Sequence, residues 1–392
     1  MEKKFTRTFV TLTLLALAAC TGIVRNPVPS DQYVDATFLD RSDLRYWADT
    51  SMFEVSNYSI HDAPLGDFTT RYAGISNQEH SYLAISGGGA KGAYGAGVLV
   101  GWTERGTRPQ FAIVTGVSTG ALIAPFAFLG PEYDQQLKEV YTTLGTKEVL
   151  KVGNIFRSLA NDGLMDSSPL TETLTKYINE EMINKIATEY RKGRRLLIGT
   201  TNLDAGRQVI WNIGLIADSG HPDSAVLIRD ILRASASIPG TFPPVYFSVE
   251  ANGKSYDEMH VDGGVAAQMF LYPGSVKMNE VVESLNVKGT PHAYLIRNSR
   301  VHPEYRPTSP SLFKITKRTI STLTRTQGVG DAYQIYAIAQ RDGVDVSLTW
   351  IPEGAVEDTS KEIFDSSYMS ALFEYGYQRA LKGEVWSHIE LN

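Results

Sequence analysis

Three short glycine-rich motifs hold the residues of this chain that could carry out chemistry. The first reads Gly-Gly-Gly-Ala-Lys-Gly over residues 87–92, between an apolar run and a predicted helix. The second is Gly-Val-Ser-Thr-Gly over 116–120, and the third is Asp-Gly-Gly over 262–264. Glycine loses more backbone entropy on folding than any other residue, so such runs indicate special backbone paths. They are candidates for loops that bind a phosphate or an oxyanion, or for turns without chemistry.

The second motif places Ser118 where a nucleophile is expected. Gly-x-Ser-x-Gly puts a serine on a sharp turn between a strand and a helix, and Gly116 and Gly120 relieve the crowding there. An apolar stretch precedes Ser118, and a small, apolar segment follows it. Since the N-terminus of a helix also favours negative charge, we predict that Ser118 is a nucleophile.

The first motif also satisfies Gly-x-Gly-x-x-Gly, so phosphate binding has to be weighed. A dinucleotide site needs a carboxylate after the second strand, where this chain has the serine motif instead. A Walker loop needs Ser or Thr after its lysine, but Lys91 is followed by Gly92. We therefore expect main-chain N–H groups of this loop to bind the oxyanion of a tetrahedral intermediate. The candidate donors are Gly88, Gly89 and Ala90.

The base that activates Ser118 could be Asp262. This residue ends a strand-like segment and precedes Gly263 and Gly264. An aspartate with the ordinary pKa of about 3.9 is a weak base for a hydroxyl group. It would need an apolar, sequestered position to serve as one. The same three residues could equally form a simple turn.

A conventional triad would instead use a histidine late in the chain. None of the late histidines lies in a segment that suggests catalysis; they are His221, His260, His292, His302 and His388. A histidine-dependent serine esterase remains one alternative. A non-catalytic protein that binds lipid or a partner on a hydrolase scaffold is another.

The N-terminus predicts export and lipid attachment. Residues 1–19 combine a basic start with an apolar stretch too short to span a bilayer, as in a signal peptide. Leu-Ala-Ala-Cys at 17–20 resembles a lipoprotein processing site, which would lipidate Cys20. Because Thr21 rather than aspartate follows, analogy with lipoprotein sorting predicts a lipid-anchored protein of the bacterial cell envelope, in the outer membrane.

Composition and charge exclude several classes of protein. The 43% hydrophobic residues are ordinary for a globular protein with a proper core. A net charge of −6 argues against nucleic-acid binding and gives no overall attraction to anionic lipid, so membrane contact would rest on the anchor. The sequence holds no recognised metal motif, and we expect neither a metal nor another cofactor.

Strands and helices alternate from residue 80 onward. Buried strands are predicted over 81–86, 111–116, 195–203, 208–213, 293–298 and 344–351, and helices over 90–104, 225–237, 317–340 and 365–383. This alternation indicates an α/β sheet layered by helices. We predict one domain over 80–392, preceded by a tether and arm over 20–79.

In this order, the three motifs resemble those of the patatin-like phospholipase family. Segments 234–245 and 364–380 also resemble its bacterial members, so the likeness covers 80–392. The resemblance implies a three-layer α/β/α fold with a central mixed, mostly parallel sheet, like the catalytic domain of cytosolic phospholipases A. It also implies a Ser118–Asp262 dyad without histidine.

The resemblance further implies a function. The chain would be a serine lipid acyl hydrolase of the phospholipase A or lysophospholipase type, cleaving fatty-acyl esters without a cofactor. Its oxyanion hole would lie at Gly87, Gly88 and Gly89. Lys91 would be the basic residue of that loop, adding positive potential or holding the loop by a salt bridge. Apolar segments 121–129 and 238–247 could line an acyl pocket or belong to the core.

Overall fold

The computed structural model describes residues 25–49, 70–152, 165–303, 305, 307–357 and 362–388. The expected signal peptide at 1–19 and Cys20 lie outside these residues. Within the described part, one ten-stranded sheet has the order β1-β7-β6-β3-β2-β10-β11-β12, with β9 paired to β6 and β8 paired to β9. Its strands are β1 (Arg45–Trp47), β2 (Ser81–Ile85), β3 (Phe111–Val117), β6 (Arg195–Asn202), β7 (Arg207–Asn212), β8 (Val245–Ala251), β9 (Lys254–Asp262), β10 (His292–Arg297), β11 (Asp345–Trp350) and β12 (Ser387–His388).

The centre of the sheet is parallel. Strands β11, β10, β2, β3 and β6 run in the same direction, while β7, β1, β12 and the β8–β9 hairpin pair antiparallel at its margins. The central strands are almost wholly buried, as in sheets covered on both faces. A small separate ribbon joins β4 (Lys151–Val152) to β5 (Met165–Asp166).

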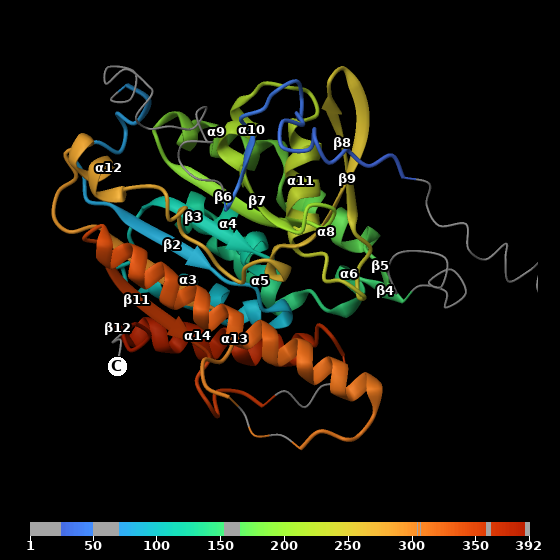
Figure 1. The fold of residues 1–392 in the computed structure, drawn as a ribbon. Coiled ribbons are helices and arrows are strands. Elements are labelled where there is room, and N and C mark those ends of the chain that lie inside the picture. Colours follow the sequence, from blue (N-terminus) through green and yellow to red (C-terminus); the bar gives the residue numbers. More distant parts are fainter. Residues whose placement is uncertain are drawn as a thin grey trace, which may run out of the picture.

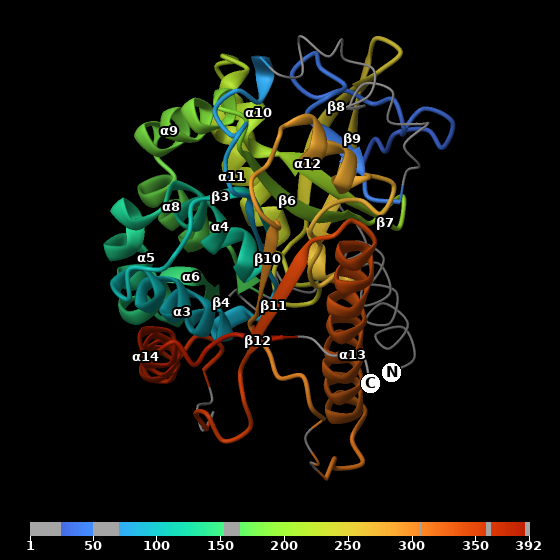
Figure 2. The same cartoon turned by 90° about the vertical axis from the view of Figure 1, so that its left-hand side faces the viewer.

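Helices cover both faces of this sheet (Figure 2). On the face opposite α12 (Met278–Ser284) and α13 (Leu312–Arg341) lie α3 (Gly92–Glu104), α4 (Thr119–Leu129), α9 (Glu180–Arg191), α10 (Ile213–Asp218), α11 (Ser224–Ser235) and α14 (Ser366–Lys382). Helix α5 (Asp134–Thr143) packs against α3, α4 and α14, while α8 (Ser168–Tyr177) packs against α6 (Thr146–Val149) and α11. The predicted three-layer α/β/α architecture is therefore confirmed. No helix among the described residues has the length and apolar character needed to cross a membrane.

The N-terminal arm packs along one margin of the sheet (Figure 1). Its β1 pairs antiparallel with β7, and Thr37 exchanges backbone hydrogen bonds with Glu250 of β8. The arm therefore lies against the β8–β9 hairpin, which ends in Asp262.

Candidate active site

Ser118 and Asp262 meet because two strands share one neighbour. β3 pairs with β6 as far as Val117 and Gly199. Beyond that point β7 still occupies the other side of β6, so β9 takes the place that β3 has left, with Asp262 opposite Thr200. The Ser118 hydroxyl donates to Asp262 Oδ2 at 2.6 Å, although the residues are 144 positions apart in the chain.

The serine sits on a strained turn held by its surroundings. Ser118 has φ 55° and ψ −126°, a conformation that non-glycine residues adopt only when packing enforces it. Its N–H donates to Ser235 Oγ at 2.9 Å, and that hydroxyl donates to the carbonyl of Gly199 at 2.6 Å. Ser235, the last residue of α11, therefore fastens the turn to β6. Only a small polar residue at the end of a predicted helix could have indicated this role from the sequence.

Gly116 and Gly120 let the turn fold this tightly. A Cβ atom on Gly116 would lie 2.4 Å from the carbonyl oxygen of Gly120. One on Gly120 would lie 2.2 Å from the carbonyl oxygen of Ile85, at the end of β2. Both positions therefore require glycine, as the motif predicts.

The glycine loop after β2 faces the serine. Gly87 is buried, and a Cβ atom there would be 3.1 Å from Ser118 Cβ. Its N–H already donates to the carbonyl of Gln268 at 3.1 Å. Among the described residues, the N–H groups of Gly88, Gly89 and Ala90 have no hydrogen-bond acceptor. These three predicted donors thus remain available to a substrate, whereas the N–H of Gly87 does not.

Asn298 fixes this loop from the end of β10. Its side-chain oxygen accepts the N–H of Gly95, and its side-chain nitrogen donates to the carbonyl of Ser86, both at 3.0 Å. A Cβ atom on Gly88 would lie 2.3 Å from the Asn298 carbonyl oxygen. Asn298 was not among the predicted functional residues. Its position directly after a buried strand, at the same sheet edge, is the signal that could have found it.

Gln268 joins the two glycine motifs and was also missed. While its carbonyl accepts the N–H of Gly87, its side-chain nitrogen donates to the carbonyl of Gly264 at 2.6 Å. Its own N–H donates to Asp331 of α13, also at 2.6 Å. The oxyanion-loop candidate, the Asp-Gly-Gly turn and α13 are therefore connected through one buried residue, by its main chain and its side chain.

Burial makes Asp262 more basic than an ordinary aspartate. The residue is only 5% exposed, and burial raises the pKa of its carboxyl group to about 6, although hydrogen bonds from Ser118 and Gly264 act to lower it. Oδ1 accepts the N–H of Gly264 at 2.7 Å, which leaves Oδ2 for the serine hydroxyl. The carboxylate is thus held in the sequestered position that a base for Ser118 requires.

Among the described residues, no histidine hydrogen-bonds to Ser118 or Asp262. His260 comes nearest in sequence, but its ring nitrogens bond to Thr200 Oγ1 at 2.9 Å and Glu258 at 3.0 Å. Burial lowers the pKa of His260, which favours the neutral ring. This histidine thus belongs to a structural network.

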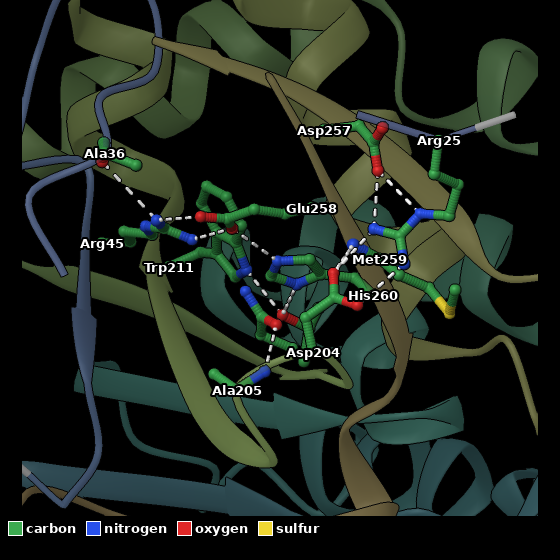
Figure 3. Close-up of polar contacts among 12 residues, drawn as sticks. Arg25, Ala36, Arg45, Asp204, Ala205, Trp211, Asp257, Glu258, Met259 and His260 are labelled. Carbon is green, nitrogen blue, oxygen red and sulfur yellow. Dashed lines mark hydrogen bonds and ion pairs between the residues drawn. The ribbon is translucent and has the colours of Figure 1, made fainter. Parts of the chain in front are cut away.

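That network leads to the N-terminal arm (Figure 3). Arg45 donates to both oxygens of Glu258, at 2.5 and 2.7 Å, and both residues are buried. Burial acts to raise the pKa of Glu258, but Arg45 and the His260 hydrogen bond lower it to about 2, so the carboxylate stays ionised. The arm therefore holds β9 four residues before Asp262.

A second arginine of the arm, Arg25, binds β9 and the turn between β6 and β7 (Figure 3). Arg25 donates to Asp204 and to Asp257, each at 2.7 Å. Asp204 in turn accepts the N–H of Met259 at 3.1 Å. Two separate ion-pair clusters thus tie the arm to β9.

An apolar cavity opens beside Ser118. It has about 820 Å³ of empty space, part of it open to solvent, and Gly89, Ser118 and Thr119 are among the residues that line it. Side chains of α4, α5, α8 and the segment after α11 line the rest; they include Leu122, Phe126, Leu144, Leu174, Ile238 and Phe242. Segments 121–129 and 238–247 thus contribute to the cavity, while other residues of both belong to the core. No described residue of the arm lines it.

The remaining predicted residues lie around this centre. A Cβ atom on Gly92 would be 2.2 Å from Thr119 Oγ1, and one on Gly263 would be 2.3 Å from the carbonyl oxygen of Gly199. Lys91 is half-buried at the start of α3, and its role stays a prediction. No group of three or more metal-ligating side chains gathers in the part of the chain described here.

Comparison with known proteins agrees with the motifs. Residues 83–272 match the sequence profile of the family described as patatin-like phospholipase. The chain is 26% identical over 201 residues to Patatin-T5 of Solanum tuberosum, a match covering 47% of this chain and 49% of that protein. It therefore spans about half the length of this curated relative. VipD from Legionella pneumophila aligns over 78% of this chain and 67% of its own, with 13% identity and a TM-score of 0.32.

Proposed function

Because the chain belongs to the patatin-like phospholipase family, we propose that it is a lipid acyl hydrolase with Ser118 as nucleophile and Asp262 as base. The observation that carries this proposal is the 2.6 Å contact between the two side chains, with Ser118 lining an apolar cavity. A buried serine–carboxylate pair opening onto apolar space suits an ester with a long acyl chain.

The reaction has two steps. Asp262 Oδ2 takes the hydroxyl proton as Ser118 Oγ attacks the ester carbonyl, and the N–H groups of Gly88 and Gly89 stabilise the oxyanion. The carbon–oxygen bond to the alcohol then breaks, and the alcohol leaves with the proton from Asp262. Water, deprotonated by the same carboxylate, adds to the acyl-enzyme and releases the fatty acid and Ser118.

The cavity supplies the site for the acyl chain. Leu122 and Phe126 of α4 line it from one side, and Ile238 and Phe242 line it after α11. Since Ser118 also lines this cavity, an acyl chain on a carbonyl carbon at the hydroxyl could occupy it. Fatty-acyl esters of phospholipids or lysophospholipids are therefore the proposed substrates.

The proposed location is the bacterial cell envelope. The signal-peptide pattern at 1–19 and the Leu-Ala-Ala-Cys motif support processing and lipidation at Cys20, with Thr21 favouring the outer membrane. Mass spectrometry of the N-terminal peptide from the processed protein tests this. A diacylated peptide beginning at Cys20 supports lipidation, and an unmodified cysteine contradicts it.

The enzymatic proposal is tested with Ser118→Ala on a short-chain p-nitrophenyl ester and on phospholipid vesicles. We expect both activities to disappear while the thermal unfolding transition is retained. Replacing His260, His292 and His302 one at a time, and measuring ester hydrolysis by each variant, tests whether the enzyme depends on a histidine. A variant at Ser118 with normal turnover, or one indispensable histidine beside a dispensable Asp262, would overturn the assignment.

A further inference from the structure

Helix α13 has two halves with opposite surroundings. In its C-terminal half, Ala332, Ile335 and Ala339 are buried against the sheet. In its N-terminal half, Leu312 is 84% exposed, Ile320 is 58% exposed and Leu323 is 65% exposed. The first half of this 30-residue helix therefore presents large apolar side chains to solvent.

The exposed half extends beyond the catalytic edge of the sheet. Strands β10 and β11 are parallel, so α13, which connects them, runs back from the edge where parallel strands end. Gln327 donates to the carbonyl of Ala266, and Asp331 accepts from Gln268, so the helix passes the site at these residues. A 30-residue helix is about 45 Å long, and six-residue strands span about 20 Å. Residues 312–325 consequently project past the site, and Figure 2 shows this end of α13 extending beyond the strands of the sheet.

This projecting half is amphipathic. At 3.6 residues per turn, Leu312, Ile315, Ile320 and Leu323 fall within about 140° of one side. The basic residues of the same segment fall on the opposite side; they are Lys314, Lys317, Arg318 and Arg325. Residues 312–325 contain no Asp or Glu, although the whole chain carries a net charge of −6. The positive charge is therefore local to this surface.

The sequence of this half has a low helix propensity, so it would not form a stable helix in water without packing against a partner. It contains threonine at 316, 319, 322 and 324 beside Ile315 and Ile320, and β-branched residues lose rotamer freedom in a helix. Most helices in proteins are stabilised by packing of an apolar face. Here the described residues offer that face nothing to pack against, so a partner outside the domain is indicated.

We propose that residues 312–325 of α13 form an interfacial helix that docks on an anionic lipid surface. The apolar side would enter the boundary between headgroups and acyl chains, and the basic side would attract the anionic headgroups. This inference deepens the proposed function, because it takes the substrate to reside in that surface. It differs from the expectation, based on net charge, that electrostatics gives no help towards anionic lipid, because the basic residues are concentrated on this one segment.

The test measures flotation of the full chain with vesicles of ether-linked phosphatidylcholine, with and without ether-linked phosphatidylglycerol. Ether lipids are not cleaved by an ester hydrolase, and every variant carries Cys20→Ser so that no acyl anchor forms. The charge variant is Lys314→Glu with Lys317→Glu, and the apolar variant is Ile320→Gln with Leu323→Gln. Matched controls are Lys254→Glu with Lys288→Glu, and Val226→Gln, all exposed positions outside α13.

We expect the parent protein to prefer anionic vesicles and the charge variant to bind them about tenfold or more weakly. The apolar variant should lose binding to a similar extent, and the controls should bind like the parent. All of these variants should hydrolyse a soluble short-chain ester at the parent rate, because no substitution touches the site. Loss of hydrolysis in Ser118→Ala with vesicle binding intact keeps the two proposals separate.

Unchanged flotation of both α13 variants would overturn the lipid proposal. So would a concentration-dependent dimer in light scattering that only the Ile320→Gln with Leu323→Gln variant abolishes, because a second copy would then cover this face.

Discussion

The two sides of the candidate site are built in different ways. On the serine side, Gly116, Ser118 and Gly120 lie within five residues, and their spacing produces the strained turn directly. On the aspartate side, Asp262 is positioned by pairing of β9 with β6 and by Arg45, which lies 213 residues from its partner Glu258. The comparison teaches that a short motif can define a nucleophile, whereas the position of its base depends on strand register and a distant ion pair.

The largest effect should come from removing the base. Asp262→Asn should lower kcat/KM for a soluble ester by about 10²–10⁴-fold, since the carboxylate no longer accepts the proton. Burial disfavours the ionised carboxylate, so the variant should be at least as stable above pH 6. Initial rates and thermal denaturation measure the two effects, with Asp345→Asn at an exposed position as the control. Near-normal turnover would show that Asp262 is not the base.

The second-largest effect is expected from breaking the ion pair between Arg45 of the arm and Glu258 of β9. Arg45→Ala leaves Glu258 buried without its cation, which should cost about 3–5 kcal/mol of unfolding free energy. Arg41→Ala removes a partly exposed pair with Asp43 and should cost about 1 kcal/mol or less. Urea denaturation followed by tryptophan fluorescence compares them. Equal losses in the two variants would mean that the arm does not hold β9.

The next prediction concerns the glycine loop, which lies on the serine side of the site. Gly88→Ala places a Cβ atom 2.3 Å from the Asn298 carbonyl oxygen, so the loop must shift and the oxyanion donors with it. A drop of about 10²–10³-fold in kcat is expected, comparable to loss of one donor. Gly330→Ala, in open space on α13, is the matched control and should leave kcat unchanged. Full activity in Gly88→Ala would remove this loop from the mechanism.

The smallest effect is the pH dependence. Because burial raises the Asp262 pKa to about 6, kcat/KM should rise with pH through this value and level off above it. Each pH unit below the pKa should reduce the rate about tenfold, since only the ionised carboxylate accepts the proton. A profile recorded with a soluble ester tests this. A rate already at its plateau well below pH 6 would contradict the buried position of the base.

Much of the fold could be predicted because its central strands are short apolar runs bounded by glycine. Strands β2, β3, β6, β7, β10 and β11 occur where the pattern predicts them, within a few residues. The helix expected over 317–340 begins five residues earlier, at Leu312, and the added residues include Leu312 and Ile315 of its exposed apolar side.

The sequence predicts which residues carry out the chemistry, but not how the fold brings them together. Ser118 and Asp262 carry recognisable motifs, but no local pattern encodes that β9 follows β3 along β6. Asn298 and Gln268 were missed because each forms hydrogen bonds with main-chain groups of residues 86–87, far away in the sequence. Such contacts depend on how distant strands and loops are aligned in the folded protein, and a single sequence does not contain a local signal for that.

The contact between Ser118 and Asp262 is tested most directly by labelling with a fluorophosphonate, which reacts only with an activated serine. We expect one adduct, located by peptide mass spectrometry on Ser118. Its rate of formation should fall by about 10²-fold or more in Asp262→Asn, as for loss of a general base. An adduct on another serine, or equally fast labelling of Ser118 in both proteins, would contradict the account.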